Sequence, residues 1–423
     1  MKLLKGSLAL VAVLSAVGYQ RAEGQTAAST EANSRTVVYT YANLADSRAA
    51  NVGSTLVLPN TITAYNNSSA SGIAALSSSG TTVVRPDNLR AVTFFSFTPN
   101  DPLYATHQRS YLQQIGAPLG WAIAQTSTVP VAVVDSGVSS HSEFGTRLLP
   151  GYDYSDNDNN PEDLLGHGTA VAGTFSAGLN NGVGIAGLSQ SPFFALRVAT
   201  AQGAVSLGAL EAAVNALRQT TAVNTVVNMS LGGAMSRATS LTSADNPFRM
   251  VHALMAPENN SKLLYVAAAG NGRPSDPNNL SSTPRGFNID TDPQTVYPAA
   301  FTHGNLITVG ALNSAGSGPA SFSNFGARSV DIFAPGELIA STGPADGYTS
   351  NDGTSFASPL VAGAASLLWS RHPSLKSAAV KCAIMASATR IPSLIARKTN
   401  RFLLLGKPIA FSRVSPKSLI LGS

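Results

Sequence analysis

The sequence predicts an α/β fold of three layers, in which a mostly parallel central sheet is covered by helices on both faces. From about residue 101, short apolar runs rich in β-branched residues alternate with stretches of small residues at helical length. The apolar runs are continuous, as is typical of strands that are buried on both faces. With 423 residues, 44% of them hydrophobic, the chain is long enough to bury one large core.

Strands and helices are expected in alternation along the chain, and this order predicts a parallel sheet. The expected strands lie within residues 128–137, 192–198, 224–233, 262–271, 305–312 and 330–336. The expected helices are rich in small residues and lie within residues 166–178, 207–219 and 355–369. Because ligands bind beyond the carboxyl ends of the strands in such sheets, the functional residues are expected at Asp135, Asn228 to Gly233, Gly270 and Asn271.

The first 24 residues have the layout of a secretory signal peptide. Two lysines precede an apolar run from Leu8 to Val17, which is too short to span a bilayer, and small residues follow. Cleavage after Gly18 and cleavage after Gly24 both fit, and a buried N-terminal helix is the alternative. No later stretch has the length and hydropathy of a membrane span, so we expect a secreted, extracellular protein without a membrane anchor.

Charge and cysteine usage narrow the function further. The chain has 27 Lys and Arg against 22 Asp and Glu, but residues 353–423 hold ten of these cations and none of the carboxylates. The main body is therefore acidic, which argues against a nucleic-acid groove through it.

Cys382 is the only cysteine, so an intramolecular disulfide is excluded. Its thiol is expected to lie buried in a helix.

Three residues could together perform nucleophilic catalysis. Ser355 lies at the expected start of a helix, and a serine hydroxyl needs a base within reach and a third group that orients the base. His167 is the one histidine in a glycine-framed motif, "GHGTAVAG", and Asp135 ends a buried strand in "VVDSG". Each has a structural alternative: a Gly/Ser turn, a histidine at helix entry and an aspartate that caps its strand. Their occurrence in one chain favours a catalytic triad.

The motifs "VAVVDSGV", "GHGTAVAG", "VVNMSLGG", "AAAGN" and "DGTSFASPLVAGAASLL" resemble those of the subtilisin-like serine proteases, closest in loop pattern to the thermitase/subtilisin branch. The resemblance covers about residues 100–390, in that family's Asp, His, Ser order. It implies a serine endopeptidase that works through an acyl-enzyme. Asp135 would orient the imidazole, His167 would act as base and then acid, and Ser355 would attack the scissile carbonyl. Ala170 and Leu360 stand where the family commonly has histidine, which leaves the packing near the site open.

The resemblance also implies how substrate is held. Asn271 and the backbone N–H of Ser355 would donate to the developing oxyanion, with an Asn-Gly turn as the alternative for Asn271. An extended peptide would pair with one edge segment and place a side chain between two walls. The first wall consists of Ser230, Leu231, Gly232 and Gly233, and the second, Ala267 to Gly270, includes Ala268 and Gly270. These small residues predict a preference for a large apolar residue before the cut.

Two loops resemble calcium sites, and calcium prefers oxygen ligands. In "GLNNGVGIAG" the expected ligands are the carbonyls of Leu179, Val183 and Ile185 and the side chain of Asn181, with Glu143 and Asp101 as carboxylates. The second loop, "YDYSDNDNNPEDLLGHG", resembles the thermitase branch and offers Asp153, Asp156 and Asp158, with Glu162 as a further candidate. A solvated acidic loop is the alternative. Calcium is therefore expected as a structural cofactor.

The resemblance implies a zymogen with four parts. Residues 1–24 are the signal peptide, 25–100 a small pro-segment that assists folding and inhibits until it is removed, 101–392 the peptidase domain and 393–423 a basic C-terminal tail. The expected partners are protein and peptide substrates and the chain's own pro-segment, and the enzyme is expected to be a monomer. The alternative is a catalytically inactive relative that serves as a binding or chaperone module. A lipase or esterase is disfavoured, because residues 353–357 read Gly-Thr-Ser-Phe-Ala and not Gly-x-Ser-x-Gly.

Overall fold

A computed structural model describes residues 36–40, 63–66, 90–93, 96–258, 260–276, 279–390 and 401–402. The described residues fall into two compact units, one that ends at residue 96 and one that begins at residue 97. The predicted signal peptide at 1–24 and most of the predicted tail at 393–423 lie outside the described residues.

The first unit contains a small antiparallel sheet. Its middle strand β1 (Thr36–Thr40) pairs with β2 (Thr63–Asn66) on one side and with β3 (Arg90–Thr93) on the other. The β1 segment reads TVVYT, a run of β-branched and aromatic residues of the kind enriched in strands. These three strands fall within the predicted pro-segment.

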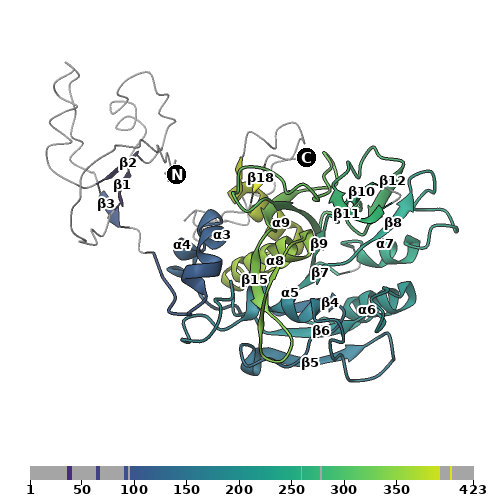
Figure 1. Cartoon of the computed structure of the whole chain (residues 1–423), viewed down its shortest axis with the longest axis horizontal. Helices are drawn as coiled ribbons and strands as arrows, with labels where there is room; N and C mark the ends of the chain where they lie inside the picture. The colour runs from purple at the N-terminus through teal and green to yellow at the C-terminus, as the bar shows by residue number, and fades with distance from the viewer. Residues whose placement is uncertain are drawn as a thin grey trace, which may run out of the picture. The chain divides into compact units, whose positions relative to one another are not determined.

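The second unit is built on a nine-stranded sheet, counted over the described residues (Figure 1). All strand pairs are parallel except the antiparallel pair at one edge, β17 with β18. In spatial order the strands are β17 (Thr389–Arg390), β18 (Arg401–Phe402), β14 (Ile332–Pro335), β13 (Leu306–Leu312), β9 (Leu263–Ala268), β7 (Thr225–Met229), β4 (Val131–Asp135), β6 (Phe193–Arg197) and β5 (Leu148–Asp153).

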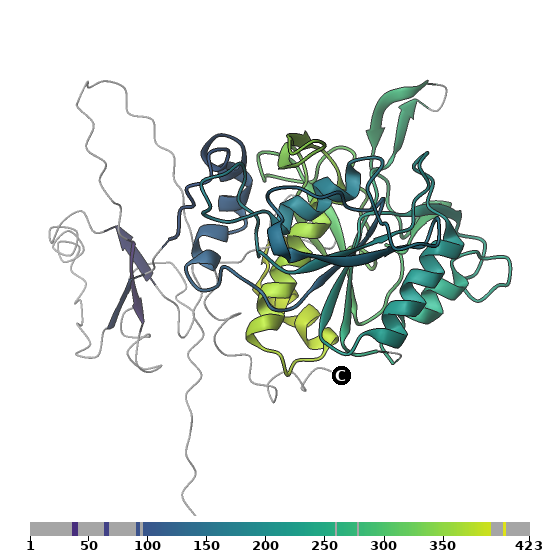
Figure 2. The ribbon, with the colours of Figure 1, turned by 90° about the horizontal axis from the view of Figure 1, so that it is seen from below.

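Helices cover both faces of this sheet, as the views in Figures 1 and 2 show. One face packs against α5 (His167–Ser176), α8 (Thr354–Arg371) and α9 (Ser377–Ser387), and the other against α6 (Leu207–Thr220) and α7 (Arg249–Met255). Alternate residues of β4 divide between the faces: Val131 and Val133 belong to the α5/α8 core, and Ala132 and Val134 to the α6/α7 core. The predicted three-layer α/β fold is confirmed.

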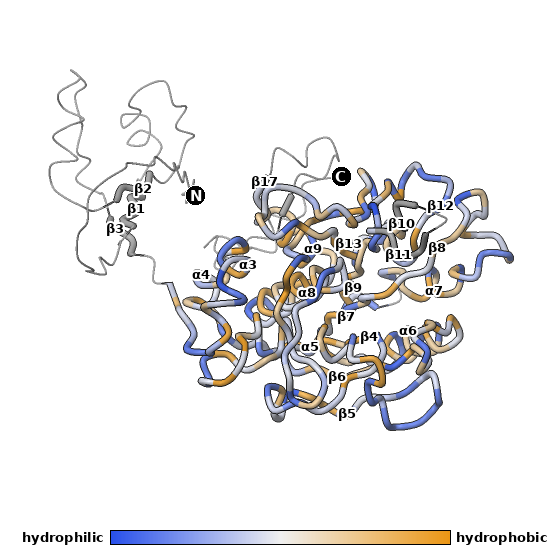
Figure 3. Tube along the Cα trace, in the orientation of Figure 1, coloured by the Kyte–Doolittle hydropathy of each residue, from blue (hydrophilic) through white to orange (hydrophobic). Residues whose placement is uncertain are grey.

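The continuous apolar runs form strands that are buried on both faces, as the sequence predicted. Every residue of β4, β7, β9 and β13 is buried, so a polar residue on either side of these strands would lose its hydration. Helix α8 is buried over most of its length as well. Figure 3 shows hydrophobic colour along the central strands and α8 and hydrophilic colour in the peripheral loops.

Short elements complete the unit around the sheet. The two-stranded sheets are β8 (Gly233–Ser236) with β12 (Gln294–Tyr297), β10 (Arg273–Asp276) with β11 (Asn279–Arg285), and β15 (Ile339–Thr342) with β16 (Tyr348–Asn351). The short helices are a π-helical turn η1 (Tyr104–Gln108), α3 (Arg109–Gln114), α4 (Ala117–Trp121) and a 3₁₀ turn η2 (Gly145–Arg147).

One sequence-based expectation is wrong: Cys382 is exposed. It lies in α9, which does form a helix over the predicted region. The buried residues of α9 are Ser377, Val380, Ala383, Ile384 and Ser387. These residues recur at helical spacing and form the inward face, and residue 382 falls outside that face.

Candidate active site

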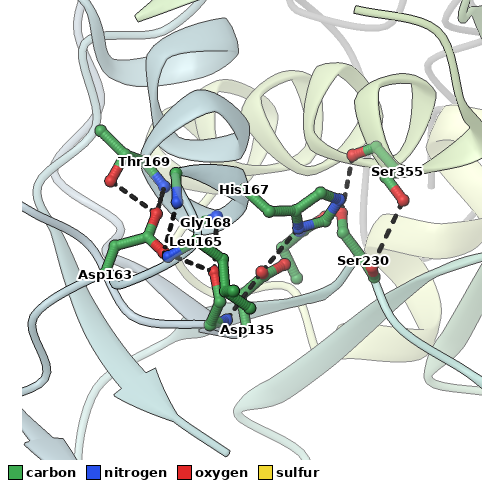
Figure 4. Close-up of polar contacts among 11 residues, drawn as sticks. Asp135, Asp163, Leu165, His167, Gly168, Thr169, Ser230 and Ser355 are labelled. Carbon is green, nitrogen blue, oxygen red and sulfur yellow. Dashed lines mark hydrogen bonds and ion pairs between the residues drawn. The ribbon is translucent and has the colours of Figure 1, made fainter. Parts of the chain in front are cut away.

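Asp135 and His167 form a hydrogen-bonded pair at the carboxyl edge of the sheet (Figure 4). Asp135 is the last residue of β4 and is buried, and His167 opens α5 after Gly166, whose φ of 80° suits glycine. The imidazole Nδ1 lies 2.7 Å from Oδ1 of Asp135. Because an ionised carboxylate can only accept, Nδ1 carries the proton and Nε2 is left as the basic nitrogen.

The carboxylate changes the proton affinity of the ring. The negative charge of Asp135 raises the pKa of His167 above its ordinary value of 6.5, and this outweighs the burial of the ring, which acts in the opposite direction. Phe356 lies against the imidazole, with ring centroids 5.7 Å apart, and limits its rotation. The geometry and charge suit a general base that becomes a stabilised cation after it takes a proton.

Ser355 lies on the other side of the imidazole, in the first turn of α8 (Figure 4). Its hydroxyl donates to the carbonyl oxygen of Ser230 at 3.3 Å, and the hydroxyl of Ser230 donates to the carbonyl of Ser355 at 2.7 Å. Catalytic hydrogen bonds often form only when substrate is bound, so this resting orientation is compatible with a nucleophile.

Asn271 is fixed by the residue before Ser355. Its Oδ1 accepts hydrogen bonds from both the backbone N–H and the hydroxyl of Thr354, each at 2.9 Å. These two donors assign the oxygen of the amide, so the Nδ2 group is the part of Asn271 that remains to donate elsewhere. A β-carbon added to Gly353 would lie 3.2 Å from that Nδ2. The amide donor and the N-terminal N–H groups of α8 therefore face the same region beside Ser355.

The structure adds a residue that the sequence reasoning missed, Asp163. Its buried carboxylate accepts from the hydroxyl of Ser136 at 2.8 Å, from the N–H and hydroxyl of Thr169 at 2.8 and 2.7 Å, and from the N–H groups of Leu165 and Gly166 at 3.0 and 2.9 Å (Figure 4). It thus joins the residue after Asp135 to the first turn of the helix that carries His167. An aspartate just before an expected helix start was the available signal.

The residues expected to hold substrate form two segments that leave adjacent strands. Ser230, Leu231, Gly232 and Gly233 follow β7, and Ala268 and Gly270 lie at and beyond the end of β9, in a sheet where β7 pairs with β9. The first segment is held to Ser355 through Ser230. The second is held to Thr354, whose hydroxyl accepts from the N–H of Gly270 at 3.0 Å. Both segments therefore border the start of α8.

The residues of the first calcium prediction come together, but their side-chain oxygens face protein donors. The Glu143 carboxylate accepts from the N–H groups of Gly178 and Ile185, each at 3.0 Å, and from the hydroxyl of Tyr348 at 2.9 Å. Asp101 accepts from the N–H groups of Asn180 and Asn181. Asn181 turns its Nδ2 toward Glu143 and its Oδ1 toward the N–H of Val183. The carboxylate and amide oxygens expected to bind calcium thus accept hydrogen bonds from the protein, and Ile185 meets Glu143 through its N–H.

The second acidic loop is organised by a cation of the chain itself. Buried Arg197 forms an ion pair with Asp153 and another with Asp156, the latter at 2.9 Å. Asp153 also accepts from the N–H groups of Ser155 and Asp156, and Asp158 accepts from that of Asn160 at 2.8 Å. The guanidinium thus compensates part of the negative charge expected to bind calcium, at Asp153 and Asp156. Among the described residues no group of three or more His, Cys, Asp or Glu is arranged to hold a metal.

A parallel α/β sheet that brings an aspartate–histidine pair beside a serine at a helix start is the arrangement of a serine hydrolase. The model of the subtilase family matches residues 126–404. The chain belongs to this family, which confirms the resemblance seen in the motifs.

Individual relatives agree with this assignment. Thermitase from Thermoactinomyces vulgaris is 33% identical over 302 residues, which cover 70% of this chain and 93% of thermitase. A subtilisin from Bacillus pumilus is 36% identical over 288 residues, which cover 67% of this chain and 92% of that protein. A crystal structure of a cold-adapted subtilisin-like serine proteinase matches with a TM-score of 0.54 and 29% identity, over 66% of this chain and 90% of the other.

Proposed function

We propose that this protein is a secreted serine endopeptidase that cleaves protein and peptide substrates through an acyl-enzyme. The observation that carries the proposal is the 2.7 Å pair of Asp135 and His167, with the free side of the imidazole facing Ser355. The membership in the subtilase family and the relatives named as proteinases support it.

In the proposed reaction, Oγ of Ser355 attacks the scissile carbonyl carbon while Nε2 of His167 takes the hydroxyl proton. The imidazolium is stabilised by Asp135, which keeps its own charge. His167 then gives the proton to the leaving amine as the C–N bond breaks, which leaves an acyl group on Ser355. A water molecule repeats the sequence with His167 as base, and the acid product leaves.

The negative oxygen of the tetrahedral intermediate needs donors that are in place before the charge develops. Asn271 offers its Nδ2 because Thr354 holds its Oδ1, and Ser355 offers its backbone N–H at the start of α8. A donor that meets the oxygen only as charge develops lowers the barrier rather than strengthening the binding of substrate. These two groups are therefore proposed as the oxyanion hole.

The direct test replaces Ser355 by alanine. Ser355→Ala should lose both casein hydrolysis and labelling by a fluorophosphonate probe, because the probe forms its bond with the activated hydroxyl. The matched control is Ser374→Ala, an exposed serine beyond the far end of α8, which should keep both. A wild-type protein that folds but reacts with neither casein nor probe would favour the inactive binding or chaperone module instead.

Processing is proposed on the sequence pattern. Residues 1–24 are removed as a signal peptide and 25–100 as an inhibitory pro-segment, which leaves a monomeric peptidase domain at 101–392 and a basic tail at 393–423. Among the described residues no helix has the length and hydropathy of a membrane span. N-terminal sequencing and intact mass of the secreted protein test both cleavage points. In Ser355→Ala the pro-segment should remain attached if its removal is autocatalytic.

We propose that the two acidic loops are stabilised by the chain's own residues in place of calcium. Arg197 supplies the positive charge among Asp153 and Asp156, and backbone N–H groups and Tyr348 fill the acceptor positions of Glu143. The calcium predicted from the sequence would have to displace these partners.

A further inference from the structure

The space between the two substrate walls lies directly beside Ser355. One wall begins at Ser230, which exchanges hydrogen bonds with Ser355, and the other ends at Gly270, whose N–H donates to Thr354. A peptide whose carbonyl carbon is attacked by Ser355 therefore places the side chain before the cut next to this space. What fills the space decides which side chains are accepted.

A third element closes the space at its base. Strand β12 pairs antiparallel with β8, which continues the first wall, and the register aligns Tyr297 with Gly233 and Val296 with Ala234. A β-carbon added to Gly232 would lie 2.9 Å from Cγ1 of Val296, and one added to Gly270 would lie 3.5 Å from the same atom. One methyl group of Val296 thus lies where a side chain on either wall glycine would begin.

Val296 is anchored and cannot easily turn away. Its exposed fraction is 8%, and it belongs to an apolar cluster with Ala269, Ile289 and Ala299. As a β-branched residue in a strand it also has few side-chain rotamers available. A substrate side chain that needed the position of this methyl group would have to displace a packed residue.

The second wall is fixed from behind by buried Asn324. Its Nδ2 donates to the carbonyl of Ala269 at 3.0 Å and its backbone N–H donates to the carbonyl of Gly270 at 3.0 Å. Its Oδ1 accepts from the N–H of Phe287 at 3.1 Å. Because both sides of this amide are bonded to backbone, the wall cannot move outward to make room for a larger side chain.

We propose that Val296 closes the space between the walls, so that the enzyme cleaves after small side chains such as alanine and discriminates against aromatic ones. This inference rests on the proposed peptidase function and replaces the large apolar preference expected from the small wall residues alone. Val296 acts here as a specificity-determining residue: it limits the depth of the space and takes no part in the bond-breaking steps.

The test measures kcat/KM on a series of succinyl-Ala-Ala-Pro-X p-nitroanilides with X as Ala, Leu or Phe. The wild type should prefer Ala over Phe. Val296→Gly should raise kcat/KM for Phe by about 10- to 100-fold, the range expected when one large apolar side chain gains a buried site. Val296→Ala should fall between the two. The matched control Val330→Ala removes the same methyl groups from the same apolar cluster and should leave the Phe to Ala ratio unchanged.

A wild-type enzyme that cleaves the Phe substrate at least as well as the Ala substrate would overturn the proposal, and so would an unchanged ratio in a folded Val296→Gly variant. If that variant does not fold, the wild-type ratio and Val296→Ala still decide. Mass spectrometry of a casein digest gives the residue before each cut independently. Failure of the peptidase function itself is recognised separately, because the wild type would then not react with a fluorophosphonate probe.

Discussion

The neighbouring strands β4, β6 and β5 end in charged residues that lie side by side. The two carboxylates among them form ion pairs with different kinds of side chain. The register aligns Asp135 of β4 and Asp153 of β5 with Arg197 of β6, which lies between them. Arg197 pairs with Asp153, whereas Asp135 pairs with His167 from α5. The arginine cation is permanent, and the histidine cation exists only when a proton is bound.

This difference separates a structural pair from the pair proposed to be catalytic. Asp153 and Arg197 are both buried, so each compensates the charge of the other. The burial of Arg197 alone would lower its pKa, but the charges of Asp153 and Asp156 outweigh it and raise the pKa. The side chain of His167 is 36% exposed, so its ring can reach a substrate and release its proton.

The largest effect is expected for Asp135→Asn. The amide preserves the shape of the carboxylate but favours the wrong tautomer of His167 and cannot stabilise its cation, so kcat should fall by about 10⁴-fold. The melting temperature of the variant, measured in parallel, should show that the fold is retained. A kcat within tenfold of the wild type would remove Asp135 from the proposed triad.

The next effect is on stability and concerns Arg197→Met. Removing one partner of a buried ion pair leaves Asp153 with an uncompensated charge and should cost about 3–5 kcal/mol in the free energy of unfolding. For a domain of this size the melting temperature should fall by about 8 °C, as measured by calorimetry on inhibited enzyme. The control Arg249→Met removes an exposed arginine and should change the midpoint little. Combining Arg197→Met with Asp153→Leu should restore most of the loss, and a loss that persists would mean that packing, not charge, is responsible.

The pH dependence of stability and of activity should also distinguish the two pairs, with a smaller effect than that of Arg197→Met. Because the pKa of His167 is raised, its protonated pair with Asp135 stabilises the fold fully below about pH 6.5, and this stabilisation is lost as the pH rises through the folded pKa. Activity has the opposite sign, since the base must be neutral, so kcat/KM should rise with pH through a midpoint above 6.5.

The two substitutions should act differently on this midpoint. In Asp135→Asn the His167 midpoint, followed by NMR titration, should move to lower pH, because the charge of Asp135 is lost and only the weaker effect of Asp163 still opposes burial. In Arg197→Met it should stay where it is in the wild type. A midpoint that moves equally in both variants would show that the row of charges acts as one network.

The smallest effect is expected from chelation. A metal ion that binds only the folded state at a thousandfold excess over its Kd would contribute about 4 kcal/mol, which EDTA would remove. Since Arg197 already pairs with Asp153 and Asp156, and Tyr348 donates to Glu143, EDTA should leave the melting temperature of the inhibited enzyme unchanged. A clear drop would restore the calcium sites predicted from the sequence at residues 179–185 and 153–158.

The parts of the molecule predictable from the sequence are those set by local patterns. Continuous apolar runs predicted the buried parallel strands, and the order of the motifs predicted which residues meet, with Asp135 and His167 in contact. Asp163, Arg197 and Val296 were not predicted in their present roles, because each acts through partners from other elements. A glycine in a wall signals an open space only if no other strand brings a side chain to it, and sequence spacing does not contain that information.

Thr354 links three parts of the site through a single side chain and its own N–H. It bonds Asn271 twice and accepts from Gly270, and it precedes Ser355 in α8. A peptide that strains the fixed Gly270 wall would therefore also strain the amide of Asn271 and the first turn of α8. Poorly fitting peptides should consequently be bound but turned over slowly, so that selectivity resides in the rate of acylation more than in affinity.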